Sequence, residues 1–311
     1  MYPIRFEPIY QDYVWGGDRI AAKYGRDCGM PRIAESWEIA DRTEAMSQVV
    51  NGPFQGRTLH DLVEELGEKL LGEGQKFDRF PLLLKIIDAK ENLSIQVHPN
   101  EETAPALKGE PKSEMWFAIE KGAVYAGLKK EAGKEEFLKA IESKKPEEAI
   151  EKIEMEAGEA VSIPGGKVHA ICAGSLLFEV QQNSNTTYRI YDWEGRNRPL
   201  HMKEALAAID WNDRHPLKKP PHRIESDLHH QFQILVSSPF FIVDKIDVFG
   251  QWHVAAIPKT FQIFFFLKGE GSLTVDGYQE LYRPGMTFLI PASSQKIELE
   301  GKCEALRVRL P

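Results

Sequence analysis

Residues 82–100 read LLLKIIDAKENLSIQVHPN, an apolar run that ends in an alternation of polar and β-branched side chains. Side chains in a strand point alternately to its two faces, so Ser94, Gln96 and His98 are predicted to share one face. Pro99 has no backbone N–H and is expected to end the strand. A polar face of this kind is typical of a strand that lines a wet pocket. We therefore predict that Gln96 and His98 form half of a metal site.

The composition bounds the class of protein. A chain of 311 residues with 42% hydrophobic and 28% charged residues is normal for a globular protein with one large domain or two ordinary ones. The formal net charge of -8 makes nucleic acid and anionic membranes poor partners, so we expect neither. Three widely spaced cysteines argue against a disulfide framework or a thiolate zinc site. The N-terminus lacks a signal-peptide pattern, and the expected location is the cytoplasm.

The hydrophobic pattern predicts a mainly β chain with a few surface helices. Most apolar residues alternate in short runs bounded by turn-forming residues, which is typical of strands. Three segments instead have helical spacing, and Thr58 and Asn100 are placed to cap the first two. The expected helices cover 59–71, 101–108 and 134–152.

A Pro-rich basic stretch divides the chain. Residues 214–223, RHPLKKPPHR, read as a linker between a domain over 1–220 and a domain over 221–311. Both parts are rich in strand patterns, and both contain the same short spacing between strands. It occurs as Gly158-x4-Ile163-Pro164 and again as Gly285-x4-Ile290-Pro291. This repeat predicts two barrels of the same type.

Ligand-type residues occur in only one copy of the repeat. His169 lies five residues after the first Ile-Pro pair, whereas Lys296 lies five residues after the second. Counted back from a glycine in each copy, Glu114 corresponds to Phe261. We therefore expect a metal in the first barrel and none in the second.

Four metal-ligand candidates emerge from these patterns: Gln96, His98, Glu114 and His169. Two imidazoles, a carboxylate and an amide oxygen suit Zn²⁺, Mn²⁺, Co²⁺ or Fe²⁺. A single histidine on a strand is more often a hydrogen-bonded core or surface residue than a ligand. Spacing alone leaves that alternative open.

The candidates lie in motifs that resemble those of the type I phosphomannose isomerases, a zinc-dependent cupin family, in its short bacterial form. The motifs are Leu83-Leu-Lys85-Ile, Ser94-Ile-Gln96-Val-His98-Pro99, Lys112-Ser-Glu114-Met115, Ile163-Pro164-x4-His169-Ala170 and Gln182-Asn-Ser-x3-Tyr188-Arg189-x2-Asp192-Trp193. They span about residue 5 to residue 200. The resemblance implies two cupin-type jelly-roll barrels in tandem and one zinc ion per chain, held by the four candidates. Relatives commonly have proline at the position of Ser113, a departure that would loosen the turn before Glu114.

The resemblance implies interconversion of mannose 6-phosphate and fructose 6-phosphate through a cis-enediol intermediate. Such a reaction needs a base, an electrophile and a positively charged side chain that binds the phosphate. The metal either stabilises the enediolate or orders the pocket. Two alternatives remain: another metal-dependent cupin sugar-phosphate enzyme, and a non-catalytic sugar-binding cupin. The expected partner is a small sugar phosphate, bound by a monomer or a homodimer.

The resemblance also implies roles for single residues. Arg189 matches an essential arginine, expected to act in catalysis and phosphate binding, although a surface ion pair is the alternative. Ser94 resembles a hydroxyl on the phosphate side. Lys112 lies two residues before Glu114, so its side chain should point to the same end of the barrel as the metal ligands. There it could bind the substrate oxygens or the phosphate. Lys85 is either a substrate-binding pocket lysine or a lysine that extends its charge to solvent.

Glu179 is the first choice for the general base. A carboxyl group in an apolar surround has a raised pKa, which suits proton abstraction. The alternative for Glu179 is a hydrogen-bonded carboxylate in the barrel wall. Asp192 and His98 are the alternative bases.

Overall fold

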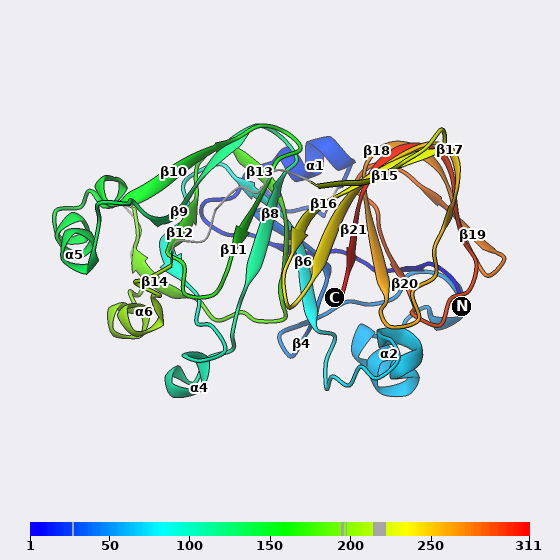
Figure 1. The fold of residues 1–311 in the computed structure, drawn as a ribbon, viewed down its shortest axis with the longest axis horizontal. Helices are drawn as coiled ribbons and strands as arrows, with labels where there is room; N and C mark the ends of the chain where they lie inside the picture. Colours follow the sequence, from blue (N-terminus) through cyan, green and yellow to red (C-terminus); the bar gives the residue numbers. More distant parts are fainter. Residues whose placement is uncertain (27, 194–195, 197, 214–221) are drawn as a thin grey trace. The chain divides into compact units, whose positions relative to one another are not determined.

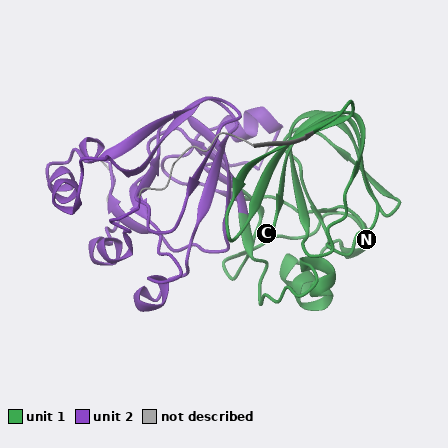
Figure 2. Ribbon diagram, viewed as in Figure 1, with its two compact units in different colours: residues 1–9, 37–83, 219–311 green, residues 10–36, 84–218 purple. Residues whose placement is uncertain are grey.

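The computed structural model of the chain consists mainly of β-sheets (Figure 1). It describes residues 1–26, 28–193, 196, 198–213 and 222–311. The chain forms two compact units, each built from separate stretches of sequence (Figure 2). Unit 1 contains residues 1–9, 37–83 and 219–311, and unit 2 contains residues 10–36 and 84–218. Of the expected linker, residues 214–221 lie outside the described residues. The expected division of the chain into two sequential domains at residue 220 stays a prediction.

The main sheet of unit 1 has eight antiparallel strands. Its order is β1 (Ile4–Arg5), β20 (Thr287–Ile290), β18 (Gln262–Val275), β21 (Ile297–Arg309), β17 (Ile242–Val254), β16 (His230–Ser237) and β15 (His222–Ser226), with β19 (Tyr278–Tyr282) paired to β18. Strands β17, β18 and β21 are long, with 13, 14 and 13 residues, because glycines bend them without ending them. Gly301 pairs with Gly250 on one side and Gly271 on the other, and its φ is 120°.

Unit 1 buries one ion pair among its apolar residues. Arg307 donates to Asp244 through Nε and Nη2, at 2.9 and 2.7 Å, and both side chains are buried. Removing one partner of such a pair leaves an uncompensated buried charge. The pair therefore makes Asp244 a sensitive position for the stability of this unit.

We predict that Asp244→Ala lowers the free energy of unfolding by about 3–5 kcal/mol, because Arg307 keeps its buried charge. The measurement is a urea unfolding curve followed by tryptophan fluorescence. Lys268→Ala is the matched control, since it breaks the pair between Lys268 and Glu304, in which the lysine is 72% exposed. Its midpoint should stay near that of the parent protein. Equal midpoints for the two variants would contradict the prediction.

Two sheets carry most of unit 2. The five-stranded sheet has the order β10 (Ile150–Met155), β9 (Gly122–Leu128), β12 (His169–Ile171), β7 (Ile95–Val97) and β14 (Tyr188–Tyr191). The six-stranded sheet has the order β11 (Ala160–Ile163), β8 (Glu114–Ala118), β13 (Ser175–Gln182), β6 (Leu82–Ala89), β3 (Glu35–Ile39) and β2 (Ile9–Gln11). A small pair, β4 (Asp41–Arg42) and β5 (Ala45–Met46), lies in unit 1. Val124 and Ile171 of the five-stranded sheet share a core cluster with Trp116 and Leu177 of the six-stranded sheet. The two sheets therefore pack face to face, and neither closes on itself within the described residues.

The helices are short. They are α1 (Arg19–Tyr24), η1 (Gly52–Phe54), α2 (Leu59–Leu66), α3 (Glu68–Leu71), α4 (Ala104–Leu107), α5 (Lys134–Glu142), η2 (Pro146–Glu148) and α6 (Met202–Ala208). Thr58 caps α2 as predicted, accepting from the N–H of Asp61, but Gly67 with φ of 47° separates α2 from α3. Asn100 accepts from the N–H of Thr103, so the start of the expected 101–108 helix is a turn and α4 is one turn long. No described helix is long and apolar enough to cross a membrane.

The expected helix over 134–152 is half correct. Helix α5 ends at Glu142, and Lys144 has a positive φ of 59° just before Pro146. Residues Ile150–Met155 then form strand β10, with a buried side chain at each end. A short apolar run fits the period of a helix as well as that of a strand, so the helical spacing at 149–153 is ambiguous.

The repeat predicted from the sequence occurs in the strand pairing. Each copy forms a short strand, β11 or β20, directly after a glycine with positive φ. Ile163 of β11 pairs with Glu114, and Ile290 of β20 pairs with Gln262. The structural counterpart of Glu114 is therefore Gln262, one residue away from Phe261. The correspondence of Glu114 with Phe261, predicted by counting back from a glycine, is therefore wrong by one residue.

Candidate metal centre and substrate cavity

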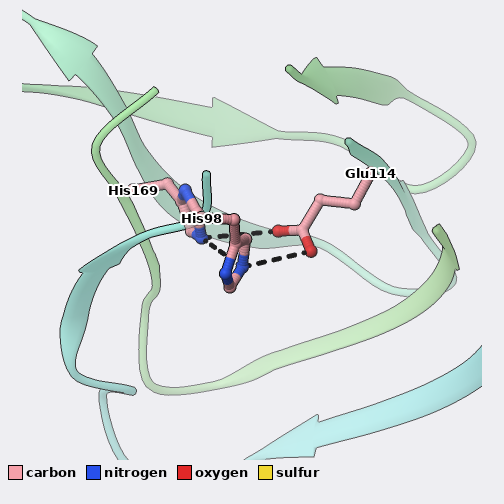
Figure 3. A group of neighbouring side chains, drawn as sticks. All are labelled: His98, Glu114 and His169. Carbon is pink, nitrogen blue, oxygen red and sulfur yellow. Dashed lines mark hydrogen bonds and ion pairs between the residues drawn. The ribbon is translucent and has the colours of Figure 1, made fainter. Parts of the chain in front are cut away.

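Three ionisable side chains converge inside unit 2: His98, Glu114 and His169 (Figure 3). The two Nε2 atoms are 3.1 Å apart, and each lies 3.4 Å from one carboxylate oxygen of Glu114. Metal–ligand bonds of about 2.0–2.2 Å in a tetrahedron place neighbouring ligand atoms roughly 3.3–3.6 Å apart. The cluster therefore has the dimensions of a metal centre.

Gln96 completes the set of four predicted ligands. Strand pairing places it opposite His169, and its Nε2 lies 3.3 Å from Nε2 of that histidine. Its Oε1 accepts from the hydroxyl of Ser94 at 3.4 Å. The predicted common face of the 94–98 strand is therefore confirmed. A half-turn of the amide exchanges its nitrogen and oxygen and directs the oxygen to the cluster, as a hard cation requires.

Both histidines are oriented by backbone carbonyls. Nδ1 of His98 lies 2.8 Å from the carbonyl of Thr186, and Nδ1 of His169 lies 2.7 Å from the carbonyl of Lys167. A carbonyl only accepts, so each Nδ1 carries the proton and each Nε2 directs its lone pair to the cluster. Burial, with help from the charge of Lys112, lowers the pKa of His98 to about 3. Burial also lowers the pKa of His169. Neutral imidazoles are the form that binds a metal.

Glu114 is a buried carboxylate whose negative charge needs a cation to compensate it. Neither of its oxygens makes a hydrogen bond of good geometry, although Nζ of Lys112 lies 2.8 Å from Oε2. Burial alone would raise its pKa, but the positive charge of Lys112, with help from the two neighbouring histidines, holds the pKa well below its usual range. An ionised, buried group with unused lone pairs is costly unless a cation compensates it. The residues present therefore fit a divalent metal ion.

The turn before Glu114 is firmly anchored. Ser113 accepts from the N–H of Gly165 through its hydroxyl, at 3.1 Å, and its own N–H donates to the side chain of Gln182, at 2.8 Å. The carbonyl of Ser113 also accepts from the N–H of Gln182. Serine therefore makes two hydrogen bonds here, through its N–H and its hydroxyl, that proline has no groups to make, and these offset the lost rigidity of the ring.

A cavity of about 310 Å³ opens beside the cluster. Of the predicted site residues, it is lined by Lys85, Ser94, Gln96, Lys112, Glu179 and Arg189. It is also lined by Tyr13, Trp15, Glu35, Trp116, Asn185, Thr187 and Arg198, which were not predicted for the site. Sequence spacing gave no signal for most of these residues, because their cavity partners lie far away in the chain.

Glu179 lies in a buried charge network at the cavity. The indole N–H of Trp116, its neighbour in strand pairing, donates to Oε1 at 2.8 Å. Lys85 lies between two carboxylates, with Nζ 3.4 Å from Glu179 and 3.4 Å from Glu35. Burial, followed by the charge of Glu114, raises the pKa of Glu179 above its usual range. Lys85 is therefore a buried pocket lysine, and the alternative of a lysine extending to solvent is wrong.

Arg189 lies on β14 directly opposite Gln96. Its Nη1 donates to the carbonyl of Pro199 at 2.7 Å, whereas its Nε is buried and has no hydrogen-bond partner among the described residues. Burial lowers the pKa of this guanidinium group. It forms no ion pair with any described residue, so the alternative of a surface ion pair is not observed. Asp192, an alternative base, instead binds Arg198 through two hydrogen bonds of 2.8 Å.

Comparison with known proteins assigns the chain to a family. Residues 4–151 match the model of the phosphomannose isomerase type I catalytic domain, and residues 231–310 match the mannose-6-phosphate isomerase cupin domain. These matches define a cupin-domain sugar-phosphate isomerase. The chain belongs to the type I phosphomannose isomerase family.

Similar proteins match along nearly the whole chain. Mannose-6-phosphate isomerase ManA of Bacillus subtilis is 33% identical, with 98% of both chains covered. Probable mannose-6-phosphate isomerase GmuF of the same organism is 31% identical, with 97% of this chain and 98% of the relative covered. A crystal structure of the mannose 6-phosphate isomerase from Bacillus subtilis superposes with a TM-score of 0.92 at 29% identity, covering 99% of each chain.

Proposed function

We infer that the protein interconverts mannose 6-phosphate and fructose 6-phosphate by metal-dependent isomerisation through a cis-enediol intermediate. The observation that carries this function is one cavity, lined by a carboxylate with a raised pKa and by a buried arginine, beside a His-Glu-His cluster. The carboxylate would serve as the base, the arginine would bind the phosphate, and the cluster would hold the metal that the reaction needs. The family relatives carry the same activity in their names.

We propose that one zinc ion per chain is held by Gln96, His98, Glu114 and His169. The short contacts among their ligand atoms and the unused lone pairs of Glu114 support this set. Bound there, the ion would supply a Lewis acid for a developing enediolate oxygen, or would order the pocket. We further propose that the two cupin parts are tandem jelly-roll barrels, of which only the first holds metal.

We propose that Glu179 carries the proton between C2 and C1. Trp116 holds Oε1, whereas Oε2 makes no hydrogen bond of good geometry and lies 3.4 Å from Nζ of Lys85, so Oε2 is the oxygen that would act on the substrate. Lys112, which lies beside the cluster and lines the cavity, would donate to the substrate oxygens as charge develops on them. Ser94 and Arg189 would bind the phosphate. Lys85 is better suited to orient Glu179 than to bind phosphate, because both of its near partners are carboxylates.

We predict that Lys85→Met moves the acidic limb of the pH profile of kcat/KM to higher pH. Glu179 acts as a base only when ionised, and the positive charge of Lys85 lowers the pKa of that carboxyl group. Removing the charge therefore raises the pKa, and more alkaline solution is needed to ionise the base. Lys121→Met, at a lysine 67% exposed, is the control and should leave the limb unchanged. A limb that stays in place in Lys85→Met would show that Glu179 does not set it.

The function is tested by an assay that couples fructose 6-phosphate formation to a dehydrogenase. The expected result is rapid turnover of mannose 6-phosphate and little or no turnover of unphosphorylated mannose. Turnover of a different aldose phosphate in preference would favour another cupin sugar-phosphate enzyme. Tight binding of sugar phosphate without turnover, by folded and metal-loaded protein, would favour a non-catalytic sugar-binding cupin.

A further inference from the structure

We propose that Arg198 is a second cationic ligand of the substrate phosphate, and that Asp192 is the positioning residue that holds it. This inference rests on the proposed function, since it concerns the phosphate of that substrate. Arg198 lines the same cavity as Ser94 and Arg189. Its side chain is 28% exposed, as expected for a group at a cavity mouth.

The contacts of Arg198 leave one edge of its guanidinium group available. Nε and Nη2 donate to the two carboxylate oxygens of Asp192, each at 2.8 Å. No partner of Nη1 is found among the described residues. A planar guanidinium group that is fixed along one edge presents its remaining N–H groups in a defined direction. Fixing the side chain before the substrate arrives lowers the entropy cost of binding.

Asp192 is well suited to this role and poorly suited to proton transfer. Its side chain is only 4% exposed. Burial alone would raise its pKa, but hydrogen bonds and charge from Arg198, with Arg189 and Arg196, hold the pKa below its usual range. A carboxylate kept ionised by neighbouring arginines is a weak base. It serves instead to hold a guanidinium group in place.

The described residues near Arg198 in the chain also support Arg189. The carbonyl of Pro199 accepts from Nη1 of Arg189, and the N–H of His201 donates to the backbone carbonyl of Arg189. Trp193, which follows Asp192, contacts the residues just before the strand that carries Gln96, because its indole N–H donates to the carbonyl of Leu93 at 2.6 Å. These contacts support the surroundings of both arginines at the cavity, next to the residue that precedes Ser94.

The charges also favour a dianion at this end of the cavity. Burial, followed by the nearby positive charge of Arg198, lowers the pKa of Arg189. Asp192 neutralises only one of the two. A phosphate monoester carries a charge of about −1.5 to −2 near neutral pH, so it compensates the remaining charge and accepts several N–H groups. A neutral sugar has no charge to compensate the arginine and no phosphate oxygens to accept its N–H groups.

The test compares Arg198→Gln with Arg196→Gln. Arg196 lies two residues before Arg198 and carries the same charge. It donates to the carbonyl of Asn92, pairs with Glu91, reaches Asp192 only at 3.9 Å and does not line the cavity. We expect Arg198→Gln to raise the KM for mannose 6-phosphate about 10- to 100-fold, the loss expected for a hydrogen bond to a charged group. The kcat should change much less. Arg196→Gln should retain the KM of the parent enzyme.

Binding of inorganic phosphate, measured by calorimetry on the metal-loaded protein, needs no turnover and separates this inference from the proposed isomerase activity. Its affinity should fall in Arg198→Gln and persist in Arg196→Gln. The double variant Asp192→Asn/Arg198→Gln should bind phosphate no more weakly than Arg198→Gln alone, because Asp192 acts through Arg198. Unchanged KM and phosphate affinity in Arg198→Gln would overturn the proposal. Equal losses in the two arginine variants would assign the effect to the general loss of a positive charge and would also overturn the proposal.

Discussion

Replacing Glu114 with alanine should remove the metal and almost all isomerase activity. Glu114 is the only carboxylate in the cluster, and its negative charge offsets much of the charge of a divalent ion. We expect kcat/KM to fall by more than about 10³-fold, at least as much as the loss of a strong electrostatic contact to the transition state. Bound zinc, measured by atomic emission after gel filtration, should fall with it.

The controls separate loss of metal from loss of fold. Glu114→Gln keeps the shape of the side chain and should also lose most of the metal, because an amide lacks the charge. Glu156→Ala changes a carboxylate that is 66% exposed and should retain both metal and activity. A folded Glu114→Ala variant with full zinc content would show that the cluster is not the metal site.

Replacing Glu179 with glutamine should leave the metal in place and remove most of the turnover. A positioned general base typically contributes about 10²–10⁴-fold, and we expect kcat to fall within that range. The indole N–H of Trp116 donates to Oε1 of Glu179 and is also able to donate to an amide oxygen, so the local structure should survive. The variant therefore separates proton transfer from metal binding.

The direct readout for Glu179 is exchange of substrate hydrogen with solvent. In heavy water, the active enzyme should wash deuterium into C2 of mannose 6-phosphate, and the Glu179→Gln variant should do so far more slowly. Glu120→Gln, at a glutamate 39% exposed, should exchange at the rate of the parent protein. Rapid exchange by Glu179→Gln would mean that another group removes the proton.

The ligand strand was predictable from sequence because its information is local. Alternation over 94–98 places Ser94, Gln96 and His98 on one face, and the structure brings their side chains to the cluster. Glu114 and His169 came from the repeat and the family resemblance, and both lie where that resemblance implies. Motifs of this kind are read along the chain, so they need no knowledge of its folding.

The rest of the cavity depends on partners that are distant in sequence. Lys85 and Glu35 meet as an ion pair although 50 residues separate them, and Arg198 acquires its direction only from Asp192. The helix predicted over 134–152 is too long, because a short apolar run fits the period of a helix as well as that of a strand. Strands such as β18, with 14 residues, continue through glycines that read as turn signals in the sequence, because a glycine can bend a strand as well as end it.

Strand register shows which residues of the second copy of the repeat stand at the positions of Glu114 and Glu179. In unit 2, Glu114 pairs with Ile163, and Glu179 lies opposite Trp116. At the matching positions of unit 1, Gln262 pairs with Ile290, and Arg307 lies opposite Phe264. An amide and an arginine therefore occupy the positions of the proposed ligand and the proposed base, and Arg307 is bound to Asp244. The described part of unit 1 contains no cluster of three metal-ligand side chains.

The central claim is that one metal ion, held by Gln96, His98, Glu114 and His169, makes the cavity the site of isomerisation. The most direct test is to strip the protein with a chelator and to titrate zinc back while measuring both bound metal and mannose 6-phosphate turnover. We predict no activity without metal and a linear recovery that stops at one zinc ion per chain. Full activity in the stripped, folded protein, or a recovery that needs two ions per chain, would contradict this account.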